Sequence, residues 1–348
     1  MSASATPGNP TPKMLAPKLS DYIDFGPGFG PRVLVFVDTE EDFDWSQPMS
    51  RANTSVASVL HLERAQSLFR RYGIRPCYLV DYPIATAPTS IGVLRPWLER
   101  GECTIGAQLH PWVNPPYSEE VNIYNSYPGN LAPEIEHAKL ANLSAAIAEN
   151  FGVEPTVYRA GRYGIGPNTA RILRELGYRI DTSVRPHFNY SKDGGANFTG
   201  IAAQPYWATP QRDLLEIPLS VTFTGTLAGI GPKLYPLAAA AEPTPGALAH
   251  LRLLNRVTLT PEGVSLEEAL AAIRIMAQRQ EALYCLSFHS PSVEPGHTPY
   301  VRNETDLERF YTWLTSVLDL LVGQMHARPA DPQDIFEAAR GGRLQTAA

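Results

Sequence analysis

The chain has 348 residues, and its 29 Lys and Arg residues against 35 Asp and Glu residues give a net charge of −6. This mild acidity excludes nonspecific binding to nucleic acid, which needs a surplus of positive charge. With 44% hydrophobic and 18% charged residues, the chain can bury a large core, so global disorder is excluded.

The two ends of the chain and its cysteines indicate where it acts. Residues 1–20 are rich in Pro, Ser and Thr and contain no apolar stretch typical of a secretion signal, so we expect a disordered tail and a cytoplasmic protein. No run of about 18 apolar residues occurs, which excludes a membrane-spanning helix. The three cysteines lie in apolar runs without a C-x-x-C pair, so we expect buried, reduced thiols: Cys77, Cys103 and Cys285.

Short apolar runs alternate along the chain with segments of helical spacing. The runs that we predict as buried strands are 32–38, 75–82, 102–110, 156–161, 178–183, 214–220 and 282–290. The predicted helices are 55–72, 90–100, 133–151, 167–177, 265–281 and 304–325. This alternation predicts parallel βαβ units. About seven units, without a glycine-rich nucleotide motif, favour an α/β fold with a distorted (β/α)7-type barrel over an open sheet.

We expect residues 21–348 to form a single domain, because no linker interrupts the pattern. The stretch near 221–256 is rich in Pro and Gly and fits no βαβ unit, so we interpret it as an insertion.

Polar side chains gather where the predicted strands end. They are Asp38, Glu40, Gln108, His110, Arg159, Glu216 and His289. In a parallel barrel all strand C-termini open on one face, so these side chains should converge there. Asp38 ends an apolar run and, beside Arg159, would be a tuned general base. Two histidines at strand ends, His110 and His289, indicate a functional site rather than packing.

Further residues are candidates for binding a substrate. Trp112 begins an aromatic loop over 112–131 that could supply a wall for a sugar ring, although its rings could equally pack the loop onto the barrel. Tyr163 carries the same ambiguity. His297, in PGHTPY, either lines the site or stabilises a turn. With Gln108 and Glu216, these residues complete the predicted substrate contacts.

Four segments together resemble a known family. VFVDTEEDFDW, IGAQLHPWVNPP, YRAGRYG and SFHSPSVEPGHTPY occur in the order and spacing of the polysaccharide deacetylase superfamily (NodB homology, carbohydrate esterase family 4), with WalW-like proteins as the nearest subgroup. The resemblance covers about residues 32–325. It implies a distorted barrel of about seven strands and hydrolysis of an N-acetyl amide, or sometimes an ester, on a sugar. It also implies a zinc-type ion held by one carboxylate and two histidines.

Carried over by position, the resemblance assigns roles to four residues. Asp38 matches the catalytic base and Arg159 the residue that orients it. His289 matches the acid that protonates the leaving amine, and Glu40 the carboxylate that binds the metal.

The second motif departs from the family pattern of two histidines separated by three residues. Gln108 and Trp112 stand at those positions, and His110 lies between them at another interval. Since glutamine is a poor zinc ligand, the metal site is altered.

Three interpretations of the site therefore remain open. Glu40 and His110 could hold a divalent ion, zinc first, with a third ligand such as another acid of the 40–44 cluster. The site could instead work without metal, as in allantoinase-type relatives, with Gln108 donating to the oxyanion. It could also bind carbohydrate without turnover.

The expected function is N-deacetylation of a sugar in glycan or lipopolysaccharide biosynthesis. Hydrolysis of a small cyclic amide or ureide is the alternative. The expected partner is a small-molecule or glycan-precursor substrate rather than nucleic acid, and assembly into a homo-oligomer is left open.

Overall fold

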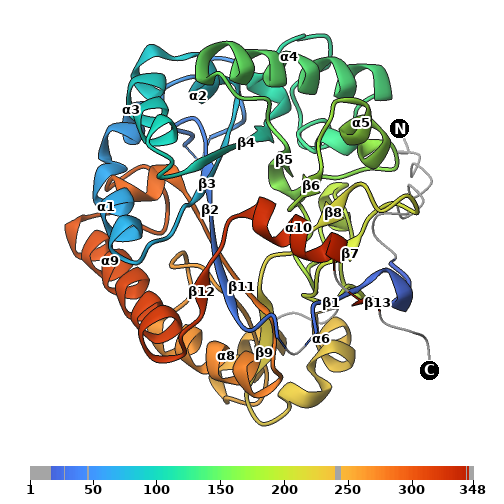
Figure 1. Cartoon of the computed structure of the whole chain (residues 1–348), viewed down its shortest axis with the longest axis vertical. Coiled ribbons are helices and arrows are strands. Elements are labelled where there is room, and N and C mark those ends of the chain that lie inside the picture. The colour runs from blue at the N-terminus through green and yellow to red at the C-terminus, as the bar shows by residue number, and fades with distance from the viewer. Residues whose placement is uncertain (1–16, 27, 45–46, 240–243, 342, 345–348) are drawn as a thin grey trace, which may run out of the picture.

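The computed structural model describes residues 17–26, 28–44, 47–239, 244–341 and 343–344 (Figure 1). Most of the predicted tail, residues 1–16, lies outside the described residues. Its last residues are ordered, since Leu19–Asp21 form a turn of 3-10 helix closed by a hydrogen bond from the backbone N–H of Tyr22 to Leu19. The disordered tail predicted over 1–20 is therefore too long at its end.

A curled sheet of parallel strands forms the centre of the molecule. The parallel strands, in spatial order, are β11 (Leu283–His289), β2 (Arg32–Thr39), β3 (Cys77–Val80), β4 (Thr104–Leu109), β5 (Val157–Ala160), β6 (Ile180–Asp181) and β8 (Leu215–Glu216). β7 (Tyr206–Trp207) adds to β8 in the antiparallel sense, and β12 (Arg328–Pro329) pairs with the start of β2. The distorted barrel with seven parallel strands is thus confirmed.

Several strands are shorter than the apolar runs that predicted them. The run 178–183 contributes only Ile180–Asp181 to the sheet. The backbone N–H of Thr182 still donates to the Tyr158 carbonyl at 2.9 Å, but at the next residue a side chain takes part instead. The Ser183 hydroxyl accepts a hydrogen bond from the backbone N–H of Ala160 at 2.8 Å. Strand pairing therefore ends where hydroxyl and carboxylate side chains occupy the barrel near the C-terminal ends of the strands.

The gap between β8 and β11 is closed by the segment that we interpreted as an insertion. β9 (Val221–Thr224) and β10 (Asn255–Thr258) pair antiparallel, with α6 (Gly231–Ala239) and α7 (Thr244–His250) in the intervening sequence. The backbone N–H of Ser287 donates to the Leu259 carbonyl at 3.1 Å, and that of Cys285 to the Ser220 hydroxyl at 2.9 Å. These bonds connect β11 to the segments flanking β9 and β10, so this region completes the wall of the barrel.

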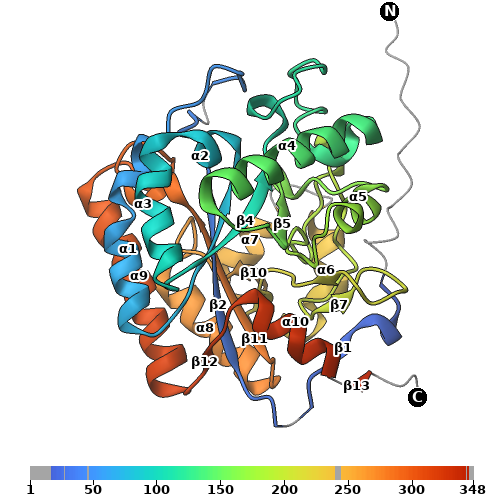
Figure 2. The same ribbon diagram turned by 45° about the horizontal axis from the view of Figure 1, so that its top comes forward.

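Helices cover the outside of the sheet (Figure 2). They are α1 (Glu63–Arg71), α2 (Tyr82–Thr86), α3 (Pro88–Glu99), α4 (Pro133–Phe151), α5 (Thr169–Glu175), α8 (Leu266–Gln278) and α9 (Glu304–Leu318). α4 has the bounds that Pro133 and Gly152 predict, with Gly152 at a φ of 73°. The predicted capping box of α8 is formed by Ser265 and Glu268. The helix predicted to reach residue 325 is α-helical only to Leu318 and continues as a π-turn, Asp319–Gln324.

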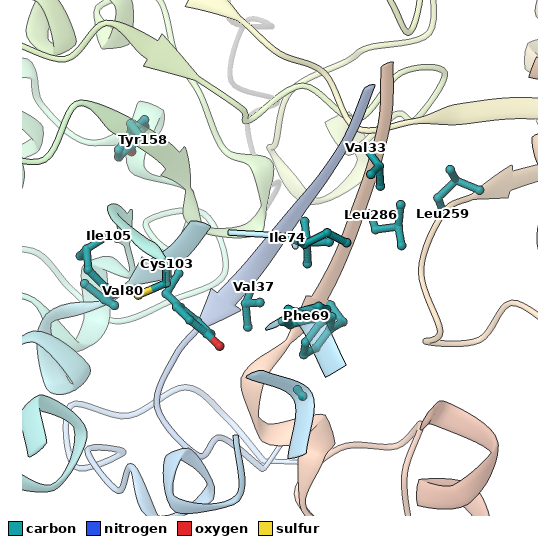
Figure 3. Packing of buried hydrophobic residues seen from close by; sticks show 14 of the residues in the cluster. Val33, Val37, Phe69, Ile74, Val80, Cys103, Ile105, Tyr158, Leu259 and Leu286 are labelled. Carbon is teal, nitrogen blue, oxygen red and sulfur yellow. The ribbon is translucent and has the colours of Figure 1, made fainter. Parts of the chain in front are cut away.

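Alternation along the strands creates two cores. Val33 and Val37 of β2 belong to the outer core beneath the helices, where Phe69 and Leu286 also lie (Figure 3). The alternate residue Phe36 belongs to an inner core that Phe336 of α10 (Pro332–Gly341) joins. In Figure 1, α10 lies across the middle of the barrel. One end of the barrel is therefore filled by apolar side chains, which leaves the end at the strand C-termini for chemistry.

The three cysteines are free and buried, as predicted. Burial raises the pKa of each thiol to about 12, so none is a nucleophile at neutral pH. Among the described residues, no helix is both long and apolar enough to cross a membrane.

Candidate active site

A cavity of about 540 Å³ opens where the parallel strands end. This volume is within the range of small-molecule sites. Eight residues predicted from the sequence line it: Asp38, Glu40, Gln108, His110, Trp112, Arg159, Tyr163 and His289. The convergence expected at the barrel face is therefore observed for the strand-end residues other than Glu216, and the geometry of each group defines what the cavity can do.

Asp38 is held at the end of β2 by a buried arginine. Arg159, only 1% exposed, donates from Nη1 to Asp38 Oδ1 and to the Ser287 hydroxyl at 2.8 Å. Its Nε donates to the Thr182 carbonyl at 3.0 Å. Because this guanidinium is fixed on several sides, it holds Asp38 Oδ1 in place and leaves Oδ2 on the side of His289 in the cavity.

His289 is the partner of Asp38 across the cavity. β11 and β2 are paired in register with His289 opposite Asp38, and Nε2 of the imidazole lies 3.8 Å from Asp38 Oδ2. Its Nδ1 lies 2.7 Å from Glu262 Oε2, and its backbone N–H donates to Glu262 Oε1 at 3.0 Å. Two adjacent strands and one glutamate therefore fix the position of the ring.

The charge of His289 follows from its neighbours. Burial alone would lower its pKa, but the carboxylates of Glu262 and Glu40 outweigh burial and raise the pKa to about 10. Glu262 is itself buried, which favours its neutral form, yet His289 and the Ser292 hydroxyl hold its pKa below the ordinary value. At neutral pH the pair is imidazolium and carboxylate, and His289 has a proton to give at Nε2.

His110 is oriented from behind by Glu41. Its Nδ1 lies 2.8 Å from Glu41 Oε2, while Trp112 donates from Nε1 to Glu41 Oε1 at 2.7 Å. The His110 and Trp112 rings are stacked with centroids 4.4 Å apart. We assign the Nδ1 proton to the bond with Glu41, so that the Nε2 lone pair faces the cavity.

Glu40 and Gln108 lie beside the open nitrogen of His110. Glu40 Oε2 is 3.6 Å from His110 Nε2 and 3.4 Å from Gln108 Nε2. Burial raises the pKa of Glu40 to about 7, although His289 and His110 oppose the shift. Gln108 Oε1 is buried and has no hydrogen-bond partner among the described residues. A carboxylate, an imidazole and an amide side chain thus lie next to one another.

A metal ion has two candidate positions around His110. Ligand atoms of Glu41, Asp81 and His110 all lie within 4.8 Å of one another, but these atoms already have partners. Asp81 accepts hydrogen bonds from the backbone N–H groups of Glu41 and Ile84, each at 2.8 Å.

The second position lies in the cavity, between Glu40 Oε2 and His110 Nε2 with the Gln108 side chain beside them, and its two ligand atoms are 3.6 Å apart. A histidine whose other nitrogen is bonded to a carboxylate is typical of metal ligands. Glu40 and His110 would be strong ligands there, Gln108 a weak neutral one, and water would fill the remaining positions.

Solved structures with little sequence identity to this chain resemble its architecture. No family model matches the sequence, and no curated protein matches it. A protein from Mycobacterium smegmatis assigned as a polysaccharide deacetylase is similar in structure, with a TM-score of 0.54 and 15% identity over 96% of this chain and 99% of that one. The Puue allantoinase is similar with a TM-score of 0.54 and 16% identity over 95% and 96% of the two chains. The chain shares the fold of these two proteins.

The polysaccharide deacetylase fold does not by itself determine chemistry. A 4-alpha-glucanotransferase from Thermococcus litoralis is also similar, with a TM-score of 0.52 and 11% identity over 91% of this chain and 42% of that one. Enzymes of different reaction types therefore share the architecture, and function has to be argued from the side chains in the cavity.

Two residues predicted to bind substrate are absent from the lining of the cavity in this deacetylase fold. Glu216 is fully buried opposite Asp181 in the β6–β8 pair. Burial raises the pKa of both carboxyls, that of Asp181 to about 6. His297 lies 3.2 Å from Glu294 and 3.6 Å from Asp42. Glu216 and His297 thus have carboxylate neighbours and do not line the cavity. We therefore leave both residues out of the proposed site.

Sequence reasoning missed Glu262, which fixes His289. Glu262 lies in the loop between β10 and α8, 27 positions before His289, and its approach depends on the hairpin that closes the barrel. No sequence motif signals this contact. Glu41 was included in the acidic cluster, but its bond to His110 becomes visible only once β2 and β4 are placed on either side of β3.

Proposed function

We propose that the chain hydrolyses an amide bond and acts as an N-deacetylase of a sugar, with Asp38 as the general base and His289 as the general acid. The observation that carries this proposal is the facing pair itself. Asp38 Oδ2 and His289 Nε2 are 3.8 Å apart, and each is fixed by a buried partner of opposite charge, Arg159 or Glu262. A base and an acid in opposite protonation states at one pH are what hydrolysis of an amide requires.

The proposed reaction assigns one proton transfer to each residue. Asp38 takes a proton from water, whose oxygen bonds to the acyl carbon. His289 gives its Nε2 proton to the nitrogen as the carbon–nitrogen bond breaks, and Glu262 stabilises the imidazolium before that step. The Gln108 amide lies next to this pair in the cavity and can donate a hydrogen bond to the negative oxygen that develops on the acyl group.

A divalent metal, zinc first, belongs to the proposal as a cofactor. Glu40 and His110 would hold it, and when bound it would polarise the acyl oxygen and lower the pKa of the attacking water. The alternative is a metal-independent amide or ureide hydrolase, which the structural similarity to an allantoinase supports. In that case Gln108 alone supplies the oxyanion contact.

The substrate that we propose is a small molecule or glycan precursor with an N-acyl group, in glycan or lipopolysaccharide assembly. The cavity volume suits such a ligand.

Acetate release from a panel of N-acetyl sugars tests the proposal. We expect turnover by the wild type and a loss of at least about 100-fold in Asp38→Asn, because the base is removed while the shape of the side chain is kept. Asp319→Asn, an exposed aspartate after α9, is the matched control and should retain full activity.

Three results separate the alternatives. Acetate release that persists unchanged in Asp38→Asn contradicts the assigned base. Ring opening of a cyclic ureide without acetate release favours the second function. Elemental mass spectrometry of the purified protein decides whether a metal is bound, and loss of about one ion per chain in Glu40→Gln is expected if Glu40 and His110 form the site.

A further inference from the structure

A second arginine lines the cavity, and the reaction proposed above does not use it. Arg185 follows β6 on the same barrel face as the catalytic pair. Its Nη1 donates to the Tyr190 hydroxyl at 3.2 Å, and its Nη2 lies 3.5 Å from the Thr258 hydroxyl. Nε is buried and has no hydrogen-bond partner in the part of the chain that the structure describes. These side-chain contacts of the guanidinium are both with neutral hydroxyl groups.

The surroundings of Arg185 hold its charge without neutralising it. Its guanidinium carbon lies 3.9 Å from the ring centroid of Phe188 and 5.4 Å from that of Tyr163. The guanidinium of Arg256 lies 3.3 Å from the same Phe188 ring, which adds a second positive charge. Within the described ranges, neither arginine has a carboxylate at ion-pair distance.

Two other charged residues of the cavity lining, Asp193 and Arg162, do not neutralise Arg185. Asp193 lines the cavity, but it forms no ion pair with Arg185 or Arg162 among the described residues. Arg162, also in the lining, donates to the Ser126 hydroxyl at 2.6 Å. A partly desolvated guanidinium without a counter-ion is costly to a protein, and its forked donors match a carboxylate or phosphate group.

Arg185 also lies close to the reacting groups. Tyr163 is next to it, and burial raises the pKa of this phenol, on which the charges of Arg185, Asp38 and Arg159 all act. Tyr163 and Arg162 have φ values of 59° and 54°, a conformation rare for such residues, so the turn after β5 is held in place to present Tyr163 here. Asp38, Tyr163 and Arg185 line the same cavity, so one ligand can occupy the space that all three border.

We infer that Arg185 binds an anionic group, phosphate or carboxylate, on the substrate, so that the enzyme acts on an acidic N-acyl sugar rather than a neutral one. This inference rests on the proposed function for the identity of the sugar. The anion site itself rests on the unneutralised guanidinium in the cavity wall.

Calorimetric titration tests the inference without turnover. In an Asp38→Asn background, N-acetylglucosamine is compared with its 1-phosphate, its 6-phosphate and N-acetylmuramic acid. We expect an acidic sugar to bind at least about tenfold more tightly than the neutral one. Adding Arg185→Gln should abolish that preference and leave affinity for the neutral sugar unchanged, while Arg185→Lys should retain part of it. The phosphate and carboxylate arms identify the source of the anion.

The matched control is Arg274→Gln, which removes the same charge from an exposed position on α8 and should leave the preference intact. Equal affinity of the parent protein for acidic and neutral sugars, or binding of none of the four, overturns the inference. So does a preference that survives in Arg185→Gln. If the preference depends on Arg185 but the protein with Asp38 intact releases no acetate, the anion site stands and the proposed function fails.

Discussion

His289 carries a positive charge at neutral pH because carboxylates surround its ring, and Glu262, from another part of the chain, raises its pKa the most. Its pKa is about 10 against an ordinary 6.5. The folded state therefore binds this proton more tightly than the unfolded chain does. The stabilisation from the pair is complete below pH 6.5 and is lost as the pH rises through about 10.

Glu262→Gln should move the alkaline limit of activity toward neutrality. The substitution keeps the size of the side chain but removes the charge that stabilises the imidazolium, so the pKa of His289 should fall by at least about one unit. The measurement is the pH dependence of kcat/KM for acetate release, together with NMR titration of the histidine protons.

Glu175→Gln, at an exposed position of α5, is the control for Glu262→Gln and should keep the wild-type profile. An alkaline limit that stays in place in Glu262→Gln would show that a group other than His289 controls it.

At the scale of elements, the turn after β5 approaches β4 so closely that only glycine fits. A Cβ atom on Gly161 would stand 2.5 Å from both the Leu109 carbonyl oxygen and Cδ2 of His110. The first of these is backbone and cannot move without displacing β4. The absence of a side chain at this position thus sets where His110 lies.

Gly161→Ala should lower the free energy of unfolding by about 2 kcal/mol or more, because the added methyl overpacks the turn. It should also reduce activity by displacing His110. Urea unfolding and acetate release measure the two effects. Gly92→Ala is the control, since Gly92 lies in α3 with open space around the position of its Cβ and alanine favours helix there. Equal stability of the two variants would contradict the close approach.

Elements with strong local signals were predicted well from the sequence. β2 and α4 follow from a continuous apolar run and from Pro133 and Gly152 at the helix ends. α6 and α7 were not predicted, because Pro236 lies inside α6 and neither helix contributes a fully buried large side chain to the main cores. Their sequence pattern gives little indication of helix.

The candidate site divides in the same way. Asp38, Arg159 and His289 were found because each lies at or near the end of a strongly apolar strand, and the barrel brings such ends together. Glu262 was not found, because its contact depends on how the β9–β10 hairpin sits against β11. We interpreted the spacing of Gln108 and His110 as a departure from the family's motif of two histidines, yet both side chains line the cavity. Residues two apart at a strand end share one side.

At the scale of the whole molecule, α10 closes the end of the barrel opposite the cavity. Phe336 is 4% exposed, and its ring lies 5.8 Å from that of Trp207 in an edge-on arrangement. The inner core thus contains side chains from the first strands of the chain and from α10, its last helix. We therefore expect the stability of the barrel to depend on both the strands and the helix.

Phe336→Ala should lower the free energy of unfolding by about 3 kcal/mol or more, since it leaves a cavity in the inner core. Activity at 25 °C should be retained, because the substitution is at the far end of the barrel from Asp38. Chemical denaturation and acetate release measure the two. Glu337→Ala, at an exposed position of the same helix, is the control and should change stability by less than about 0.5 kcal/mol. A loss of activity in the folded Phe336→Ala protein would contradict this separation.

The register that places His289 opposite Asp38 also sets when the proposed acid–base pair is completed during synthesis. The ribosome releases the base, its arginine and the Glu40–His110 pair early, whereas the strand with the acid emerges only after residue 289. Until then β2 lacks its neighbour on that side and exposes a strand edge. A nascent or truncated chain would therefore display only half of the proposed acid–base pair, and pairing of two distant strands would complete that pair and protect the exposed edge in a single event.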